Sequence, residues 1–382
     1  MCAVFAADMK EQNRLQVYHA IRQTPGQAVT RTEIGRKTGI SAPTVLKIFD
    51  FFERRGLLVS EGEKNVMDAG RKPSVFRFVP AAALTVGVTY DGHVLEMSLV
   101  DLNYQTVKHR RFPLTTDVAS MVGETLPRCL PEFTAGAPRI LGIGVSLPAS
   151  VNNAEKRITY QAFPSFRERM SKGSLMPECN ALEKRMGVPV LLENDVNCAA
   201  IAEYRQLGLG EQDDLIYIML GGGVGAGLVM DGRLRRGGNF SCGEIGYMVW
   251  NADYRGDSRT GYLEDLLYRA PKERYGVDLL RTDVSVPEAL VSELADTLAI
   301  AIANLSNALD VSRFILGGCV AERLGELLLQ EVNARLFRLC VHDAYLIPAC
   351  CADGCARGAA SLLIQQELDK FLSDRGDPEP DA

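Results

Sequence analysis

The sequence has little of what metal centres, disulfide frameworks or membrane anchors require. Its ten cysteines and four histidines are scattered, and no Cys-x-x-Cys pair occurs, so we expect reduced thiols in an intracellular protein. No apolar run has the length of a membrane span, and the apolar start lacks the basic segment of a signal peptide. With 17 prolines, 47% apolar and 24% charged residues, the chain is neither wholly disordered nor fibrous. We expect a soluble cytoplasmic protein.

Charge is distributed unevenly over the 382 residues. Residues 1–80 hold 13 Lys and Arg against 8 Asp and Glu, a net charge of +5, whereas residues 81–382 carry a net charge of −11. A basic amino-terminal module on an acidic body indicates that only the first part meets a polyanion. Many surface modules carry such a positive surplus without binding nucleic acid. The order of the helices and strands is therefore better evidence for DNA binding than the charge.

The first 80 residues have the element order of a winged helix-turn-helix domain. The pattern predicts helices over 13–23, 33–38 and 42–55 and wing strands over 57–59 and 74–79. Thr30 and Glu33 form a capping box for the second helix, which Gly39 ends, and Ser41 is the expected N-cap of the third. In such domains the amino-terminal end of the third helix enters the major groove of double-stranded DNA.

Polar residues at two places of this module are candidates for DNA contacts. Ser41 and Thr44 are placed to contact phosphates or base edges, and Lys47 to reach deeper into the groove. Arg71 and Lys72, between a glycine and a proline, form a basic corner of the wing suited to phosphates or a narrow minor groove. By themselves these two cations could be ordinary solvated loop charges.

From residue 81 the pattern changes to alternating strands and helices, which is typical of an α/β fold. Strands are predicted over 84–88, 94–100, 140–146, 188–193, 215–220 and 313–316, and helices over 196–204 and 291–309. Asp91 and Gly92 are the expected hairpin turn between the first two strands. Several strands end in glycine-rich segments, where backbone amides could cradle phosphates or sugars. Tight turns use glycine without any ligand, so the glycines alone are weak evidence.

Five short segments of the body occur together: Glu-Asn-Asp-Val-Asn at 193–197, Gly-Val-Gly-Ala-Gly at 223–227, Gly-Glu-Ile-Gly-Tyr at 243–247, Gly-Tyr-Leu-Glu at 261–264 and Leu-Gly-Gly at 316–318. In this order and spacing they resemble the ROK family, which unites sugar kinases with sugar-responsive transcriptional repressors. The segment 30–80, with Gly-Arg-Lys-Pro at 70–73, resembles the amino-terminal domain of the repressor branch. The resemblance implies an α/β, two-lobed actin-like ATPase (sugar kinase) fold behind the winged helix-turn-helix.

The resemblance also implies a division of the chain into parts. These are a DNA-binding domain over 1–80, a small lobe over 81–194 completed by a helix over 355–375, a large lobe over 195–354 and a disordered tail over 376–382. Family members usually form dimers, so we expect a homodimer or a dimer of dimers. No coiled coil or repeat in the chain derives the oligomer directly.

The sugar site that the resemblance implies consists of Asn194, Asp195, Glu244, Tyr247 and Glu264. In sugar-binding relatives the Asn-Asp pair holds sugar hydroxyls, and the Asp is the base for the hydroxyl that attacks ATP. Independently of the family, a carboxylate beside an amide suits vicinal hydroxyls. The pair could also serve as the N-cap of the following helix, and both roles can hold together. Tyr247 replaces a His and could stack on a sugar or merely fill the space.

Departures from the kinase pattern are informative. Family kinases position metal-bound phosphates with an Asp-x-Gly-Gly-Thr loop. In this chain Thr89 stands in place of the Asp, Asp91 in place of the first Gly and His93 in place of the Thr. A second phosphate loop has Gly222 instead of the usual Thr. The Asp91 carboxylate would repel a triphosphate, and the loss of the acid at position 89 removes a metal partner. We therefore expect no catalytic residue, no cofactor and no enzyme activity.

The zinc site of the family is also expected to be absent. Tyr247, Arg255, Asp257 and Tyr262 stand at the places of its ligands, and they lack the thiolates and imidazole that zinc prefers. As a hypothesis, an ion pair between Arg255 and Asp257 and the packing of Tyr262 replace the crosslink that the metal provides.

These features predict a DNA-binding repressor of carbohydrate-metabolism genes whose catalytically inactive body senses a sugar and mediates dimerisation. The expected partners are double-stranded operator DNA and a small sugar or sugar phosphate, with no membrane. Two alternatives are an active sugar kinase fused to a DNA-binding domain, and a repressor with a vestigial site that a protein partner controls.

Overall fold

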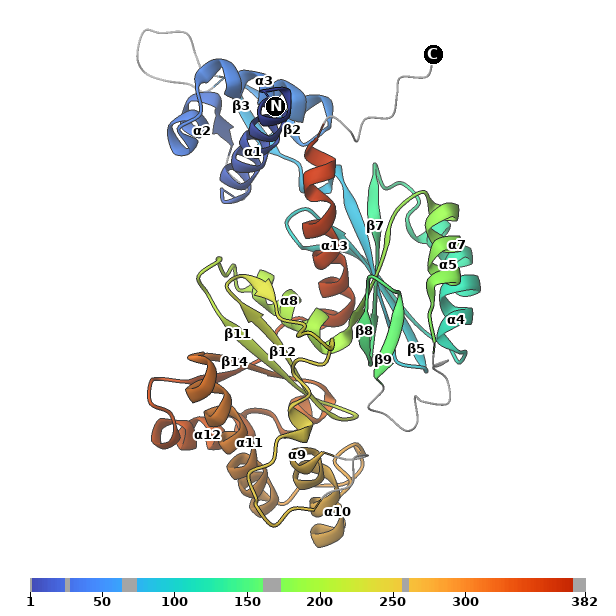
Figure 1. Cartoon of the computed structure of the whole chain (residues 1–382), viewed down its shortest axis with the longest axis vertical. Coiled ribbons are helices and arrows are strands. Elements are labelled where there is room, and N and C mark those ends of the chain that lie inside the picture. Colours follow the sequence, from blue (N-terminus) through green and yellow to red (C-terminus); the bar gives the residue numbers. More distant parts are fainter. Residues whose placement is uncertain (1, 25–27, 64–73, 161–172, 256–260, 374–382) are drawn as a thin grey trace.

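The molecule is elongated, with an amino-terminal domain at one end of the long axis and two sheet-containing parts below it (Figure 1). Figure 1 shows a computed structural model, which describes residues 2–24, 28–63, 74–160, 173–255 and 261–373. A long carboxy-terminal helix, α13 (Gly354–Leu372), runs from the amino-terminal domain along the first sheet (Figure 1).

The amino-terminal domain has the predicted winged helix-turn-helix order. It comprises α1 (Cys2–Arg22), α2 (Arg31–Thr38), α3 (Ala42–Arg54) and an antiparallel sheet of β1 (Val29–Thr30), β3 (Ser74–Phe78) and β2 (Leu58–Glu63) in that order. The capping box is confirmed, because Thr30 Oγ1 accepts from the Glu33 amide at 3.2 Å and Glu33 Oε2 accepts from the Thr30 amide at 2.8 Å. Gly39 ends α2 in the left-handed region, at φ +71°.

The predicted cap of the third helix is wrong in one respect. Ser41 occupies the N-cap position of α3, but its hydroxyl makes no capping hydrogen bond to the backbone. Instead, Ser41 Oγ lies 3.0 Å from Thr44 Oγ1, so the two hydroxyls bond to each other. The side chain of Ser41 is therefore turned along the exposed end of the helix rather than toward its free amides.

The first body sheet has the order β10-β7-β4-β5-β6. Its strands are β4 (Leu84–Tyr90), β5 (Val94–Asp101), β6 (Thr106–Pro113), β7 (Ile140–Leu147) and β10 (Val190–Asn194). The hairpin pairing of β4 with β5 confirms the predicted turn, and β7 pairs in parallel with both β4 and β10. α13 covers one face, and α4 (Val118–Ser120), α5 (Leu126–Phe133) and α7 (Met176–Met186) cover the other (Figure 1).

The second body sheet has the order β13-β12-β11-β14-β15. Its strands are β11 (Leu215–Leu220), β12 (Val224–Met230), β13 (Arg233–Leu234), β14 (Arg313–Gly317) and β15 (Tyr345–Pro348). α11 (Glu288–Leu309) and α12 (Cys319–Leu339) pack on it through a large apolar core, and α8 (Asp195–Gln206) packs on β11 and β12. Among the described helices, α11 alone has the length and apolar composition of a membrane span, and it lies in this core.

The glycine-rich segment 223–227 runs into the start of β12, which pairs with β11. A Cβ at Gly227 would lie 2.6 Å from Ala200 Cβ and 2.6 Å from the Val196 carbonyl oxygen, both on α8. Gly227 therefore allows α8 to lie against the strand. The expected role of the segment as a cradle for phosphates or sugars stays a prediction.

Shorter elements complete the body. They are the 3₁₀ turns Pro80–Ala82 and Ile245–Tyr247, the strands β8 (Ser150–Asn152) and β9 (Arg157–Tyr160), α9 (Tyr262–Glu264), α10 (Ala270–Tyr275) and the π-helical turns Met121–Thr125 and Asp265–Arg269. The predicted tail over 376–382 lies outside the described residues.

Helix α13 joins the body to the amino-terminal domain. Near its start, Gly358 lies so close to α8 that a Cβ there would be 1.7 Å from the Cys198 carbonyl oxygen. Near its end, Leu368 and Phe371 belong to one core cluster with the helices of the amino-terminal domain. Arg14 of α1 also donates to the Leu372 carbonyl at 2.9 Å. One continuous helix therefore contacts both α8 and the amino-terminal domain.

Candidate ligand cavity and DNA-binding surface

A cavity of about 300 Å³ lies between the two body sheets. Four of the five predicted sugar-site residues line it, namely Asn194, Asp195, Glu244 and Glu264. They come from the end of β10, the start of α8, the segment before the 245–247 turn, and α9. Tyr247 is half-buried and is not among the residues that line the cavity.

Asn194 and Asp195 combine the two roles that the sequence left open for them. Asn194 is the N-cap of α8, because its Oδ1 accepts from the Asn197 amide at 3.0 Å. Its Nδ2 donates to the Ala149 carbonyl and to Asp195 Oδ1, each at 3.2 Å. Asp195 Oδ1 also accepts from the Val196 amide at 2.8 Å, which leaves Oδ2 available to a ligand in the cavity.

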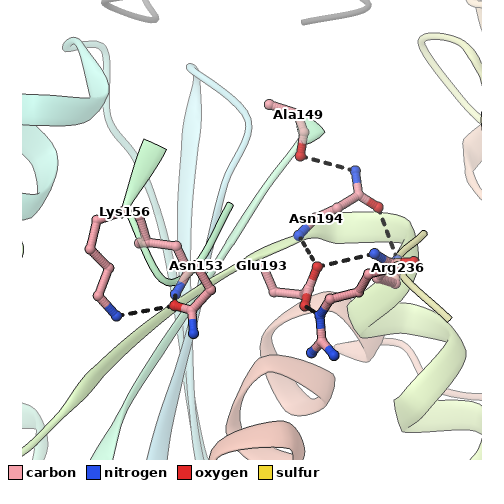
Figure 2. A network of polar contacts seen from close by, with 8 residues as sticks. Ala149, Asn153, Lys156, Glu193, Asn194 and Arg236 are labelled. Carbon is pink, nitrogen blue, oxygen red and sulfur yellow. Dashed lines mark hydrogen bonds and ion pairs between the residues drawn. The ribbon is translucent and has the colours of Figure 1, made fainter. Parts of the chain in front are cut away.

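A buried network behind this pair was not predicted from the sequence (Figure 2). Glu193 Oε1 accepts from the Asn194 amide and from Asn197 Nδ2, both at 3.0 Å. Its Oε2 pairs with Arg236 Nε at 2.6 Å. Because Arg236 lies more than 40 residues away, between β13 and the loop before Glu244, nothing local in the sequence signals the pair.

A second, partly buried contact holds the β8–β9 hairpin against β10 (Figure 2). Asn153 Oδ1 accepts from Lys156 Nζ and from the Leu192 amide, each at 3.0 Å. Lys156 also donates to the Val190 carbonyl. The hairpin positions Ser150, which lines the cavity and donates to Glu244 Oε1 at 3.0 Å.

The carboxyl groups of the cavity have raised pKa values. Burial, followed by the charges of Glu244 and Asp91, raises the pKa of Asp195 to about 7 against the hydrogen bond from the Val196 amide. Burial, then the charges of Glu244 and Asp265, raises the pKa of Glu264 to about 7. Burial also raises the pKa of Glu244, although its hydrogen bond with Ser150 opposes the change. These acids therefore lie in a field of like charge.

Asp91 and His93 line the same cavity from the turn between β4 and β5. Asp91 Oδ1 accepts from the amides of His93 and Val94, both at 2.8 Å, and so closes the turn. The carboxylate lies at the cavity, where the sequence comparison with the kinase loop placed it. Gly222 lines the cavity as well.

The region that corresponds to the zinc site is partly described. Tyr262 packs edge-on against the rings of Trp250 and Tyr254, with centroids 5.1 and 4.7 Å away. Arg255 donates to the backbone carbonyls of Ala252 and Tyr254. Asp257 lies outside the described residues, so its ion pair with Arg255 and the expected lack of zinc both stay predictions.

The predicted DNA-contacting residues of α3 lie at one end of that helix. Ser41 and Lys47 are exposed and Thr44 is half-buried, while the opposite face, with Val45, Ile48 and Phe49, is buried in the domain core. An exposed polar stripe over a buried apolar face leaves the helix available to a groove. Arg71 and Lys72 lie outside the described residues.

A sequence model of the ROK family matches residues 85–261. Over these residues the chain is similar to the ROK family. The xylose repressor of Bacillus subtilis (strain 168) is 22% identical over 386 residues, which span 94% of this chain and 96% of that protein. The beta-glucoside kinase of Listeria monocytogenes is 28% identical over 267 residues, which span 63% of this chain and 83% of the kinase.

The fold matches a solved structure over nearly the whole length of the chain. That structure is a ROK family transcriptional regulator, a homologue of the E. coli MLC protein. The match has a TM-score of 0.75 at 19% identity and spans 95% of this chain and 98% of the regulator, so the two share the fold of the amino-terminal domain and of both body sheets. The beta-glucoside kinase, by contrast, matches only part of the chain.

Proposed function

We propose that this protein is a transcriptional repressor of carbohydrate-metabolism genes that binds operator DNA and is controlled by a small sugar or sugar phosphate. The observation that best supports this proposal is the sequence similarity to a xylose repressor over 94% of the chain, together with the cavity in the body. Operator DNA as partner implies a cytoplasmic protein. A pseudo-palindromic operator requires a homodimer or a dimer of dimers, with half-sites about one helical turn (~34 Å) apart.

The body acts as a sensor rather than as a catalyst in this proposal. Asp91 places a carboxylate at the cavity where a triphosphate would have to approach, and Thr89 cannot replace an acid as a metal partner. Asn194, Asp195, Glu244 and Glu264 remain in place to hold hydroxyls of a sugar. Tyr247 would contribute only if ligand binding brought the 245–247 turn toward the cavity.

Helix α13 is the element that we infer to carry the signal. The start of α8 supplies Asp195 to the cavity, and Cys198 in the same first turn touches α13 at Gly358. The far end of α13 lies in the core of the DNA-binding domain, where Arg55 donates to the Ser373 carbonyl at 2.9 Å. A sugar that closes the two sheets over the cavity would shift α8, and α13 would pass that shift to the winged helices.

Selection of genomic fragments that bind the full-length protein, followed by fluorescence anisotropy, tests the DNA-binding part. We expect Lys47→Ala and Arg71→Ala to weaken operator binding and to lower the salt slope by about one each, because each removes a phosphate or base contact. Lys272→Ala, an exposed lysine of α10 in the body, is the matched control and should leave both values unchanged. Absence of any selected sequence, or equal effects of all three variants, would contradict the proposal.

An active sugar kinase fused to a DNA-binding domain is the second candidate. It is favoured by Asp195, whose pKa of about 7 is near that of an effective general base. Mg-ATP with a panel of sugars separates the two candidates. Sugar-dependent ADP formation that Asp195→Asn abolishes would establish the kinase, whereas sugar binding without turnover supports the sensor.

A further inference from the structure

Two neighbouring cysteines and a buried glutamate come together where α8 meets the segment that leads into α13. Glu203 lies near the carboxyl end of α8 and is 1% exposed, whereas Cys350 and Cys351 lie in the connection from β15 to α13. One carboxylate oxygen of Glu203 and the two sulfur atoms all lie within 4.8 Å of one another. Glu203 precedes Cys350 by 147 residues in the chain, so the packing of α8 against this connection is what brings them together.

Hydrogen bonds hold the carboxylate of Glu203 in one orientation. Its Oε1 accepts from the backbone amides of Cys350 and Cys351, both at 2.8 Å. Its Oε2 accepts from Cys350 Sγ at 2.9 Å. Oε1 is therefore committed to the backbone, while Oε2 is presented to the sulfur atoms. In metal sites, hydrogen bonds of this kind orient the group that binds the ion.

A nearby arginine supplies a counter-charge to this cluster. Arg357 of α13 is 7% exposed, and its Nη1 donates to Cys351 Sγ at 3.6 Å. The same guanidinium is held by the Tyr104 carbonyl at 2.6 Å and by Gln206 Oε1 at 2.7 Å. One carboxylate, two thiolates and a divalent ion together carry a charge of −1, which the guanidinium neutralises. Neutrality matters here because an unbalanced buried charge is costly.

The three donor atoms suit a thiophilic divalent ion such as zinc. Zinc binds thiolate sulfur at about 2.3 Å and carboxylate oxygen at about 2.0–2.2 Å, and tetrahedral geometry places these ligand atoms about 3.3–3.8 Å apart. Small rotations of the cysteine side chains can bring the three atoms to that spacing. Cys350 is exposed and Cys351 is half-buried, so the ion can enter from solvent and keep a water as its fourth ligand. Mg²⁺ and Ca²⁺ prefer oxygen ligands.

The same thiols are poorly suited to act as nucleophiles or as a redox pair. Burial, followed by the hydrogen bond to Glu203, raises the pKa of Cys350 to about 11. Burial and the charge of Glu203 also raise the pKa of Cys351, against the opposing charge of Arg357. Thiols that stay protonated at neutral pH react slowly with oxidants. A divalent ion, by contrast, displaces the proton of a thiol that coordinates it.

We propose that Glu203, Cys350 and Cys351 form a binding site for one thiophilic divalent cation such as Zn²⁺. Glu203 Oε2 and the two thiolates are the protein ligands, and each thiol releases its proton to the solvent when the ion binds. The ion thereby ties the carboxyl end of α8 to the segment that leads into α13. These residues do not line the sugar cavity, and the proposal does not depend on the repressor function.

Titration of the full-length protein with Co²⁺ and then Zn²⁺ tests the proposal, after reduction with a phosphine and removal of metal with a chelator. Thiolate-bound Co²⁺ absorbs in the near ultraviolet by charge transfer. One equivalent of Co²⁺ should produce this band, and Zn²⁺ should then remove it. Below pH 8 the affinity for Zn²⁺ should rise about a hundredfold per pH unit, because two thiol protons leave for each ion bound.

Four single variants separate this site from the other cysteines. Cys350→Ser and Cys351→Ser should each weaken Zn²⁺ binding at least about tenfold and reduce the charge-transfer band. Glu203→Gln keeps an oxygen for the amides of residues 350 and 351, so it should remain folded but lose at least about tenfold in affinity. Cys319→Ser removes an exposed thiol outside the cluster and is the matched control, which should leave affinity and band unchanged.

Thermal unfolding without metal verifies that each variant is folded, and with Zn²⁺ the unfolding midpoint should rise in the wild type and in Cys319→Ser. Four results would overturn the proposal. These are no charge-transfer band in the wild type, an equal loss of affinity in Cys319→Ser, an affinity that does not change with pH, or full retention of the ion when both Cys350 and Cys351 are replaced by Ser. Operator binding tests the repressor function separately.

Discussion

The ion pair between Glu193 and Arg236 should stabilise the base of the ligand cavity, and Arg236→Met tests this directly. The side chain of Glu193 is 3% exposed and that of Arg236 is 35% exposed. The substitution retains much of the volume of the arginine stem but leaves the buried carboxylate without its counter-charge. The two donors to Glu193 Oε1, from Asn194 and Asn197, remain.

The magnitude follows from this burial. Removing one partner of a fully buried ion pair costs about 3–5 kcal/mol. Because Arg236 is partly exposed, water can reach the site, and we expect a loss of about 2–3 kcal/mol in the free energy of unfolding. Glu193→Gln keeps an acceptor for the two neutral donors and should cost less, about 1–2 kcal/mol. The double variant should cost less than the sum of the two, because neither charge is then unpaired.

Equilibrium unfolding in urea, followed by circular dichroism, measures these differences. Arg281→Met is the matched control, because Arg281 and Asp283 form a surface pair in which each side chain is 63% exposed, and its loss should leave the free energy of unfolding nearly unchanged. Equal losses for Arg236→Met and Arg281→Met, or strict additivity in the double variant, would refute the reasoning. Sugar affinity should also fall in Arg236→Met, since Glu193 holds the backbone at Asn194.

Three further predictions concern the cavity and α13. The raised pKa of Asp195 means that its contribution to stability is present at pH 4 and is lost as the pH rises through about 7. In thermal unfolding without ligand, Asp195→Asn should therefore gain about 2–3 kcal/mol in the free energy of unfolding relative to the wild type between pH 5 and pH 8, and a pH-independent difference would contradict this. Gly358→Ala should cost at least about 2–3 kcal/mol in urea unfolding, because its Cβ would meet the Cys198 carbonyl at 1.7 Å, whereas Gly238→Ala, with nothing within 4 Å, should stay within about 0.5 kcal/mol. Phe371 lies in the core shared by α13 and the amino-terminal domain, and Phe371→Ala should leave sugar binding intact but reduce the effect of sugar on operator affinity. Anisotropy titrations of operator DNA with and without sugar measure that effect. An unchanged effect in the variant would argue against a role of α13.

Local sequence determined the secondary structure where short-range chemistry is sufficient. The capping box joins Thr30 to Glu33, and Gly39 ends the same helix with a positive φ. Both features depend only on residues of this short segment, and both are present as predicted. Strand β11 has the predicted bounds Leu215–Leu220, since a buried strand appears as a continuous apolar run. Asn194 as the N-cap of α8 is likewise a local hydrogen bond. The family resemblance then named four residues that line one cavity.

Only the tertiary structure decided what these elements meet. Gly227, at the end of the segment that is expected to cradle phosphates or sugars, makes room for α8 against β12. The pairing of Glu193 with Arg236, and the arrival of Asp91 in a cavity with Glu264, join residues far apart in the chain. Such contacts depend on how two sheets pack, and hydrophobic periodicity carries no information about which distant charges that packing brings together.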